Sequence, residues 1–196
     1  MRFGVSITIS LGLGASVAEQ GTYAQELARV IEESGIDSIW VADRTVYPPD
    51  LPKLHPERWG PGGEDVRGQN VLEPVTTLGF IAGATRTVKL GFSVMVLPFR
   101  HPVLNAKMVT TLDVLSGGRV MFGVGVGWMP EEFEGMGADF STRGLVTDEH
   151  LEMFKALCTE GSVRNQYLRW FQGSLSRSAC ASGYQVVLRM MVCILN

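Results

Sequence analysis

The sequence predicts an α/β fold in which helices cover a parallel β-sheet. Strand-like and helix-like segments alternate four times over residues 1–160. Each predicted strand is apolar on both faces, which is typical of parallel strands buried between layers. The stretch 86–149 is the most regular, because a strand, a helix and a second strand follow one another within about 40 residues. That order indicates a right-handed βαβ unit.

The first strand is expected over residues 2–10, where polar and apolar side chains alternate. A helix is expected over 19–34, and Gly35 follows it as a left-handed stop. The large apolar side chains of this helix recur at offsets of 4, 7 and 8, which places them on one face. They are Tyr23, Leu27, Val30 and Ile31.

The second strand is expected over residues 36–42 and ends at Asp43 and Arg44. The loop that follows, 44–70, is rich in proline, glycine and charge. Connections of this length are usually functional or disordered. This one follows the carboxyl end of a parallel strand, where barrel and doubly wound enzymes place their sites. It is therefore either a wall of the site or a variable surface insertion. Its best candidates for touching a substrate are His55 and Trp59.

The third unit begins with a helix over 71–85 that has Pro74 in its first turn. The side chains expected to face inward are Val75, Leu78 and Ile81. An apolar, β-branched run then predicts a strand over 88–97, which Pro98 stops. A helix follows from Pro102 to the glycine pair at 117–118. Its apolar face comprises Leu104, Met108, Leu112 and Leu115.

The fourth strand is expected over 119–125 and runs into a glycine-rich corner at 125–128. An acidic short helix around 131–134 follows the corner. A longer helix is expected over 142–158, with an apolar face on one side. That face comprises Leu151, Phe154 and Leu157.

Composition excludes several classes of function. The net charge of −3 lacks the basic footprint of a nucleic-acid-binding protein. No apolar run approaches the roughly 18 residues of a membrane span, and the N-terminus lacks the continuous apolar core of a signal peptide. Three cysteines without a CxxC pair argue against disulfides and zinc and favour the cytoplasm. The three histidines are scattered, so no metal site is expected.

Glycines cluster at the end of the fourth strand, at positions 123, 125 and 127. Glycine at such a place usually means that a ligand or another backbone approaches closely. A dinucleotide fingerprint, GxGxxG, would need a glycine where Trp128 stands, and no acidic strand end follows at the right distance. A nicotinamide-binding Rossmann fold is therefore set aside.

Four linked motifs carry a resemblance to a known family. They are LPFRHP at 97–102, TLDVLSGGR at 111–119, GVGVGWMPEEF at 123–133 and RGLVTDE at 143–149. Through them, residues 1–160 resemble the luciferase-like flavin or deazaflavin oxidoreductases. The resemblance implies a (β/α)8 TIM barrel, of which this chain carries about the first four β/α units. It also implies a cofactor, coenzyme F420 or alternatively FMN.

In similar proteins the cofactor ring lies across the carboxyl ends of the strands. A bulge in the third strand, often with a non-prolyl cis peptide, supports the ring; here it would fall near Ser93 and Val94 and press Val94 and Met95 against the ring. The cofactor-binding residues that the resemblance implies are Asp43, Arg44, Ser93, Val94, Met95, Gly125, Val126 and Gly127.

Two positions depart from the family pattern. Deazaflavin members often carry a histidine where Arg44 stands, and some dehydrogenases carry a glutamate where Trp128 stands. No catalytic acid or base is therefore assigned, and Arg44 is free to pair with an anionic group of cofactor or substrate. Three further motif residues are expected to be structural: Glu132, Arg143 and Asp148. The loops that bind phosphate in barrel enzymes, after strands seven and eight, have no counterpart here.

Residues 161–196 differ from the rest of the chain and form a second expected segment. They contain four arginines and no acidic residue, whereas residues 1–160 contain 13 basic and all 20 acidic residues. A change of coding frame near residue 160 would explain the shift and would leave a truncated product with unpaired strand edges. The alternative is a natural short variant whose apolar run, 186–195, covers the open sheet.

The function expected is hydride transfer through F420 or FMN to or from a small-molecule substrate. Molecular oxygen is a further reactant if the cofactor is FMN, and a family-like homodimer is expected. The alternative is an inactive fragment, or a dimer partner that binds no cofactor.

Overall fold

The described strands form one parallel sheet. The computed structural model describes residues 1–7, 17–48, 50–59, 71–159 and 189–192. The strands are β1 (Gly4–Ser6), β2 (Ser38–Val41), β3 (Lys89–Phe92), β4 (Met95–Val96), β5 (Val120–Gly125) and β6 (Arg189–Val192). β1 pairs with β2 and β2 with β3, while β5 pairs with β3, β4 and β6. The predicted parallel α/β fold is confirmed.

β3 and β4 are two parts of one interrupted strand, because both pair with β5. Gly91 lies opposite Met121, and Met95 lies opposite Val124. The β3–β4 segment therefore advances four residues where β5 advances three. One extra residue in one strand of a pair is a β-bulge. The strand predicted over 88–97 is thus broken at the place where the resemblance puts the bulge.

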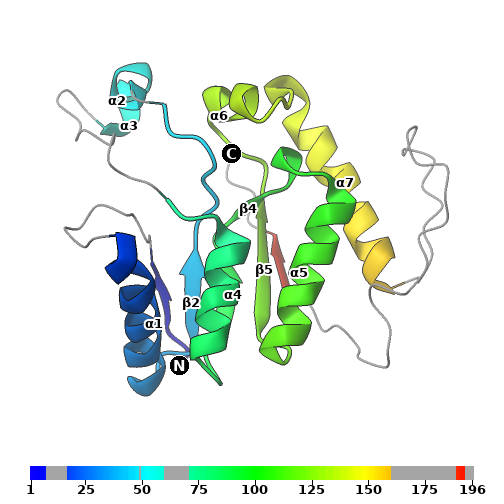
Figure 1. Cartoon of the computed structure of the whole chain (residues 1–196). Helices are drawn as coiled ribbons and strands as arrows, with labels where there is room; N and C mark the ends of the chain where they lie inside the picture. Colours follow the sequence, from blue (N-terminus) through cyan, green and yellow to red (C-terminus); the bar gives the residue numbers. More distant parts are fainter. Residues whose placement is uncertain (8–16, 49, 60–70, 160–188, 193–196) are drawn as a thin grey trace.

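Four long helices cover one face of the sheet (Figure 1). They are α1 (Val17–Glu33), α4 (Pro74–Ala84), α5 (Pro102–Ser116) and α7 (Arg143–Thr159). Shorter elements lie near the carboxyl ends of the strands. These are α2 (Leu51–Leu54), α3 (Pro56–Trp59), η1 (Leu97–Phe99), α6 (Pro130–Gly135) and η2 (Phe140–Thr142). The expected order of strands and helices is confirmed from β1 to α7.

The core lies between the sheet and these helices. Phe122 is fully buried, stacks on Phe154 of α7 at 4.7 Å between ring centroids, and meets Phe92 edge-on at 5.6 Å. Burying one such ring stabilises the fold by roughly 1.5–3 kcal/mol. The inward face predicted for α4 is confirmed, since Leu78 and Ile81 are fully buried.

The apolar stripes predicted for α1 and α5 are confirmed only in part, because Ile31 and Leu112 are buried and Leu27 packs against the core, whereas four other members are exposed. In α5, Leu104 and Leu115 are 53% and 79% exposed, and in α1, Tyr23 and Val30 are 52% and 58% exposed. Smaller side chains fill the interior beside Ile31 and Leu112. They are Ala24 and Ala28 of α1, and Asn105, Ala106, Val109 and Thr110 of α5. Small side chains let a helix approach the sheet closely, and this tight packing overrides the amphipathic pattern.

The helix boundaries follow the predicted start and stop residues. Pro74 and Pro102 occupy first-turn positions of their helices, and Gly117 ends α5 in the left-handed conformation at φ 72°. Glu73 caps α4, because its side chain accepts a hydrogen bond from the N–H of Thr76 at 2.7 Å. The loop predicted over 44–70 contains α2 and α3 in its described part.

Several expectations fall partly outside the described residues. The predicted first strand, 2–10, is described only to residue 7, and the side chain of Trp59 is not described. Of the predicted segment 161–196, only β6 is described, and it pairs with the edge of β5. This strand lies within the run 186–195 that one of the two interpretations assigned as a cover. None of the described helices combines the length and apolar character that crossing a membrane requires.

Candidate cofactor site

A hollow of about 160 Å³ lies at the carboxyl end of the sheet. Seven of the eight predicted cofactor residues line it: Asp43, Arg44, Ser93, Val94, Gly125, Val126 and Gly127. Met95 does not, because its side chain is fully buried in the main core. Small-molecule pockets usually enclose about 300–1,000 Å³, so these walls make up part of a site.

A larger hollow, of about 800 Å³, opens at the amino-terminal end of the strands, around Gly4, Trp40 and Lys89. The indole of Trp40 fills the space where side chains on Gly4 and Gly91 would stand. Functional sites of parallel sheets form at the carboxyl ends, because the loops that follow the strands converge there. We therefore place the candidate site at the smaller hollow.

The bulge forms one wall of the hollow. The peptide bond between Ser93 and Val94 is cis, as the resemblance to the family implied. A side chain at Gly123 would overlap the carbonyl oxygen of Phe92, and one at Gly125 would overlap a methyl group of Val94. The sequence left open whether a ligand or another backbone approaches these glycines. At Gly123 it is the backbone of the bulge.

Gly127 turns the chain at the corner. It adopts φ 81°, a left-handed conformation that favours glycine. A side chain there would also meet Phe133 and Val96. These two residues form a small apolar cluster with Phe99, whose ring centroid lies 4.8 Å from that of Phe133. The corner is thereby held against β4.

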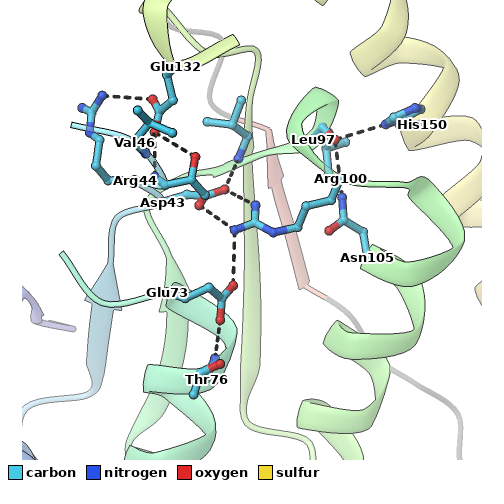
Figure 2. Close-up of polar contacts among 12 residues, drawn as sticks. Asp43, Arg44, Val46, Glu73, Thr76, Leu97, Arg100, Asn105, Glu132 and His150 are labelled. Atoms are coloured by element: carbon cyan, nitrogen blue, oxygen red, sulfur yellow. Dashed lines mark hydrogen bonds and ion pairs between the residues drawn. The ribbon is translucent and has the colours of Figure 1, made fainter. Parts of the chain in front are cut away.

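Asp43 lies beneath the bulge, with its side chain fully buried (Figure 2). Its Oδ2 accepts hydrogen bonds from the N–H of Val96 at 2.9 Å and from Nη1 of Arg100 at 2.6 Å. Its Oδ1 accepts one from Nη2 of Arg100 at 2.9 Å. Both carboxylate oxygens are therefore engaged by the protein itself.

Arg100 also donates to Oε1 of Glu73 at 3.2 Å. Burial lowers the pKa of Arg100, but the hydrogen bonds and charges of Asp43 and Glu73 outweigh it and raise the pKa above its usual value. The guanidinium thus stays charged. The sequence did not single out Arg100 or Glu73, although the LPFRHP motif contains the arginine.

Arg44 is held at the mouth of the hollow. Its Nη1 lies 3.0 Å from Oε2 of Glu132, a carboxylate whose side chain is 4% exposed. The guanidinium also lies over the rings of Tyr47 and Trp128, at 5.7 and 5.4 Å from their centroids. The other oxygen of Glu132 accepts the N–H of Thr45 at 2.7 Å. Glu132 has the structural role expected of it, and it partly neutralises Arg44.

His55 attaches the long loop beside the hollow. Its two ring nitrogens lie 3.2 Å from a carboxylate oxygen of Glu57 and 3.1 Å from one of Glu131. Its ring meets Trp128 edge-on at 5.2 Å. The pKa of Glu131 is lowered, first by a hydrogen bond from its own backbone N–H and then by His55. Since Trp128 lines the hollow, the loop contributes to that wall.

The titratable side chains that line the hollow are all paired within the protein. They are Asp43, Arg44 and Glu132. Two other residues expected to be structural lie away from it: Arg143 donates to the carbonyl of Phe140 at 2.9 Å, and Asp148 is exposed. Across the part of the chain that is described, no group of three or more potential ligands is arranged to hold a metal ion.

Comparison with known proteins places this chain among related sequences. It matches the luciferase-like monooxygenases over residues 1–173, a range that extends beyond residue 160. A protein of Mycobacterium tuberculosis, itself uncharacterized, is 33% identical over 150 residues. The match covers 76% of this chain and 53% of the relative. The chain therefore spans about half the length of this curated relative.

Solved structures share the fold at low sequence identity. Monooxygenase RslO1 from Streptomyces bottropensis has a TM-score of 0.78 at 21% identity, over 98% of this chain and 53% of that chain. The oxygenating constituent of 3,6-diketocamphane monooxygenase from Pseudomonas putida, solved with FMN, has a TM-score of 0.68 at 16% identity over 89% and 44%. An F420-dependent secondary alcohol dehydrogenase, solved with an F420–acetone adduct, has a TM-score of 0.68 at 18% identity over 97% and 51%.

Proposed function

This chain belongs to the luciferase-like monooxygenase family, and from that membership we propose that it supplies the ring-binding part of a flavin- or deazaflavin-dependent oxidoreductase. The observation that carries the proposal is the meeting of the Ser93–Val94 bulge with the corner at 125–127 in one hollow. A small-molecule substrate would lie against the exposed face of the ring.

The residues of the hollow fit a flat aromatic ring. Val94 and Val126 contribute apolar side chains to the lining, while Gly125 and Gly127 contribute backbone alone, because protein side chains fill the space beside their α-carbons. When bound, the cofactor supplies a ring that accepts or donates a hydride. The described residues hold the ring and keep water from its bulge side. No proton donor is assigned among them, because the acidic and basic side chains that line the hollow are held in ion pairs with other protein groups.

We propose coenzyme F420 as the cofactor and FMN as the alternative. The linked motifs of the sequence favour the deazaflavin branch, and the fold likeness includes both an F420-dependent and an FMN-binding protein. Stopped-flow oxygen consumption with each reduced cofactor separates the two chemistries, since reduced flavin reacts with oxygen readily and reduced deazaflavin does not. No consumption with FMNH₂ would remove the monooxygenase reaction.

Titration of the purified chain with oxidised F420 and with FMN tests the proposal directly. Binding is expected to quench the fluorescence of one cofactor. The variant Val94→Asp, which puts a charge into the hollow, should weaken binding at least tenfold. The matched control Val114→Asp alters an exposed valine of α5, 58% exposed, and should not. A folded chain that quenches neither cofactor would instead favour the inactive fragment or cofactor-free dimer partner.

The family-like homodimer remains a prediction. Sedimentation equilibrium of the chain with and without cofactor measures it, and a monomer at every concentration would contradict it.

A further inference from the structure

The bulge leaves a backbone group of β4 without a strand partner on the β2 side. The ladder between β2 and β3 ends where Val41 pairs with Phe92 and accepts the N–H of Ser93 at 2.7 Å. Beyond that point β4 pairs only with β5 among the described strands. The N–H of Val96 therefore has no acceptor on the backbone of β2.

The carboxylate of Asp43 takes the place of that acceptor. Val96 is 6% exposed, and a buried N–H without a partner is strongly disfavoured. The hydrogen bond to Oδ2 of Asp43, at 2.9 Å, satisfies it. Because Val96 lies two residues after Val94, this bond sets where the bulge sits relative to the end of β2.

Arg100 holds the carboxylate in that position. Its two terminal nitrogens grip both oxygens of Asp43, and its side chain is only 10% exposed. Such two-point contacts between a guanidinium and a carboxylate fix orientation as well as charge. Glu73 then ties Arg100 to the start of α4, through the N–H of Thr76 (Figure 2).

We propose that Asp43 and Arg100 are positioning residues, which hold Val94 at the height at which it meets the cofactor ring, and that Glu73 extends this support to α4. The inference rests on the proposed function, because it concerns the wall of the hollow that would contact the cofactor ring. It also revises the role of Asp43, whose carboxylate acts through Val96 and does not itself bind the cofactor. The network joins the ends of β2, β4 and the start of α4 beneath the hollow.

The test uses four variants of the full chain: Arg100→Met, Arg100→Lys, Glu73→Gln and, as a matched control, Arg143→Lys. Arg143 is a half-buried arginine that contacts Phe140 and does not contact Asp43. Lysine keeps the charge at position 100 but loses the two-point grip. Glu73→Gln removes the charge of the ion pair with Arg100 and keeps one side-chain oxygen that can still accept the N–H of Thr76. Thermal unfolding of each variant establishes that it is folded.

The first readout needs no cofactor: the hydrogen-exchange rate of the Val96 amide, measured by NMR. Exchange should quicken about tenfold or more in Arg100→Met and by a smaller factor in Arg100→Lys. In Arg143→Lys it should stay within about twofold. If Arg100→Met does not fold, the exchange rates of the other three variants are compared instead. They should decrease in the order Arg100→Lys, Glu73→Gln, Arg143→Lys. An unchanged Val96 rate in folded Arg100 variants would overturn the proposal.

The second readout is the dissociation constant of the complex between the chain and the cofactor, F420 or FMN, measured by fluorescence quenching. It should rise about tenfold in Arg100→Met and less in Arg100→Lys, in the same order as the exchange rates. If exchange quickens while ring binding is unaffected, the network supports the fold alone and the positioning role is refuted. If the unaltered chain binds neither cofactor, the proposed function fails, and the exchange rates still decide whether Arg100 fixes the bulge.

Discussion

Replacing Gly125 with alanine tests the packing of the bulge against the glycine corner. The new β-carbon would lie under 3.0 Å from a methyl group of Val94 and 3.3 Å from its β-carbon. Rotation of the Val94 side chain relieves the first overlap and moves a methyl group into the hollow. It does not relieve the second, because the β-carbon is fixed to the backbone. The bulge itself must therefore shift by a few tenths of an ångström.

Overpacking of this kind costs about 1–3 kcal/mol. At about 2 kcal/mol, the midpoint of thermal unfolding should fall by roughly 4–8 °C for a chain of this size. Ring binding should weaken at the same time, since both outcomes alter the wall that Val94 forms. Differential scanning calorimetry and the fluorescence titration measure the two effects.

Two further variants isolate the cause. In the double variant Gly125→Ala/Val94→Ala, the methyl groups that collide are gone but the 3.3 Å contact with the β-carbon of residue 94 remains, so it should recover only part of the loss, about 1 kcal/mol. Gly83→Ala is the control, because among the described residues no atom outside the backbone of its own helix lies within 4 Å of the new β-carbon, and alanine in α4 should stabilise by about 0.5–1 kcal/mol. A Gly125→Ala chain as stable as the original, or a double variant without recovery, would refute the overlap between Val94 and Gly125.

Three other predictions concern stability. Phe122→Ala removes a fully buried ring that stacks on Phe154, so urea unfolding should show a loss of about 3–5 kcal/mol; a loss below 1 kcal/mol would contradict this packing. Partial burial raises the pKa of Glu32, but N–H groups at 86–88 outweigh it and lower the pKa from 4.5 to about 2. The folded state therefore favours the carboxylate, and its stabilisation, about 1 kcal/mol after allowance for solvent screening, is present above pH 4.5 and lost as the pH falls towards 2. In Glu32→Gln, the free energy of unfolding should therefore depend less on pH in that range. An unchanged dependence on pH would count against these hydrogen bonds. Burial lowers the pKa of His150, which contacts the carbonyl of Leu97 at 3.2 Å, so protonation favours the unfolded chain and stability should decline as the pH falls below 6.5. His150→Gln should remove that component, and a decline of equal size in both chains would assign it elsewhere.

Local patterns in the sequence determined the order of strands and helices and most of their ends. Pro74, Pro102 and Gly117 act within a few residues of themselves, so their effect on helix starts and stops can be predicted without a partner. The bulge at Ser93 and Val94 was located by the resemblance to the family and by no local pattern. The helix starts and stops could be predicted from the residues because their physical causes are short-range.

The buried faces of α1 and α5 were predicted only in part: Ile31 and Leu112 are buried as expected, and the tertiary structure decided the rest. An amphipathic pattern assigns large apolar side chains to the interior, yet Leu104 and Leu115 lie outside, while Ala28 and Ala106 lie inside. How closely a helix approaches the sheet depends on its neighbours on all sides. Neither distance nor neighbours can be read from the periodicity of one segment.

The partners of the site residues also depended on the tertiary structure. Asp43 and Arg44 were predicted as cofactor contacts, but their charges are met by Arg100 and Glu132, which lie 57 and 88 positions further along the chain. The glycine at 123 was ambiguous between a ligand and a backbone neighbour, and the carbonyl of Phe92 occupies the space. The sequence determined which groups stand at the strand ends. The tertiary structure decided which of these groups form hydrogen bonds and ion pairs with one another. Such interactions depend on distance in space and not on separation along the chain.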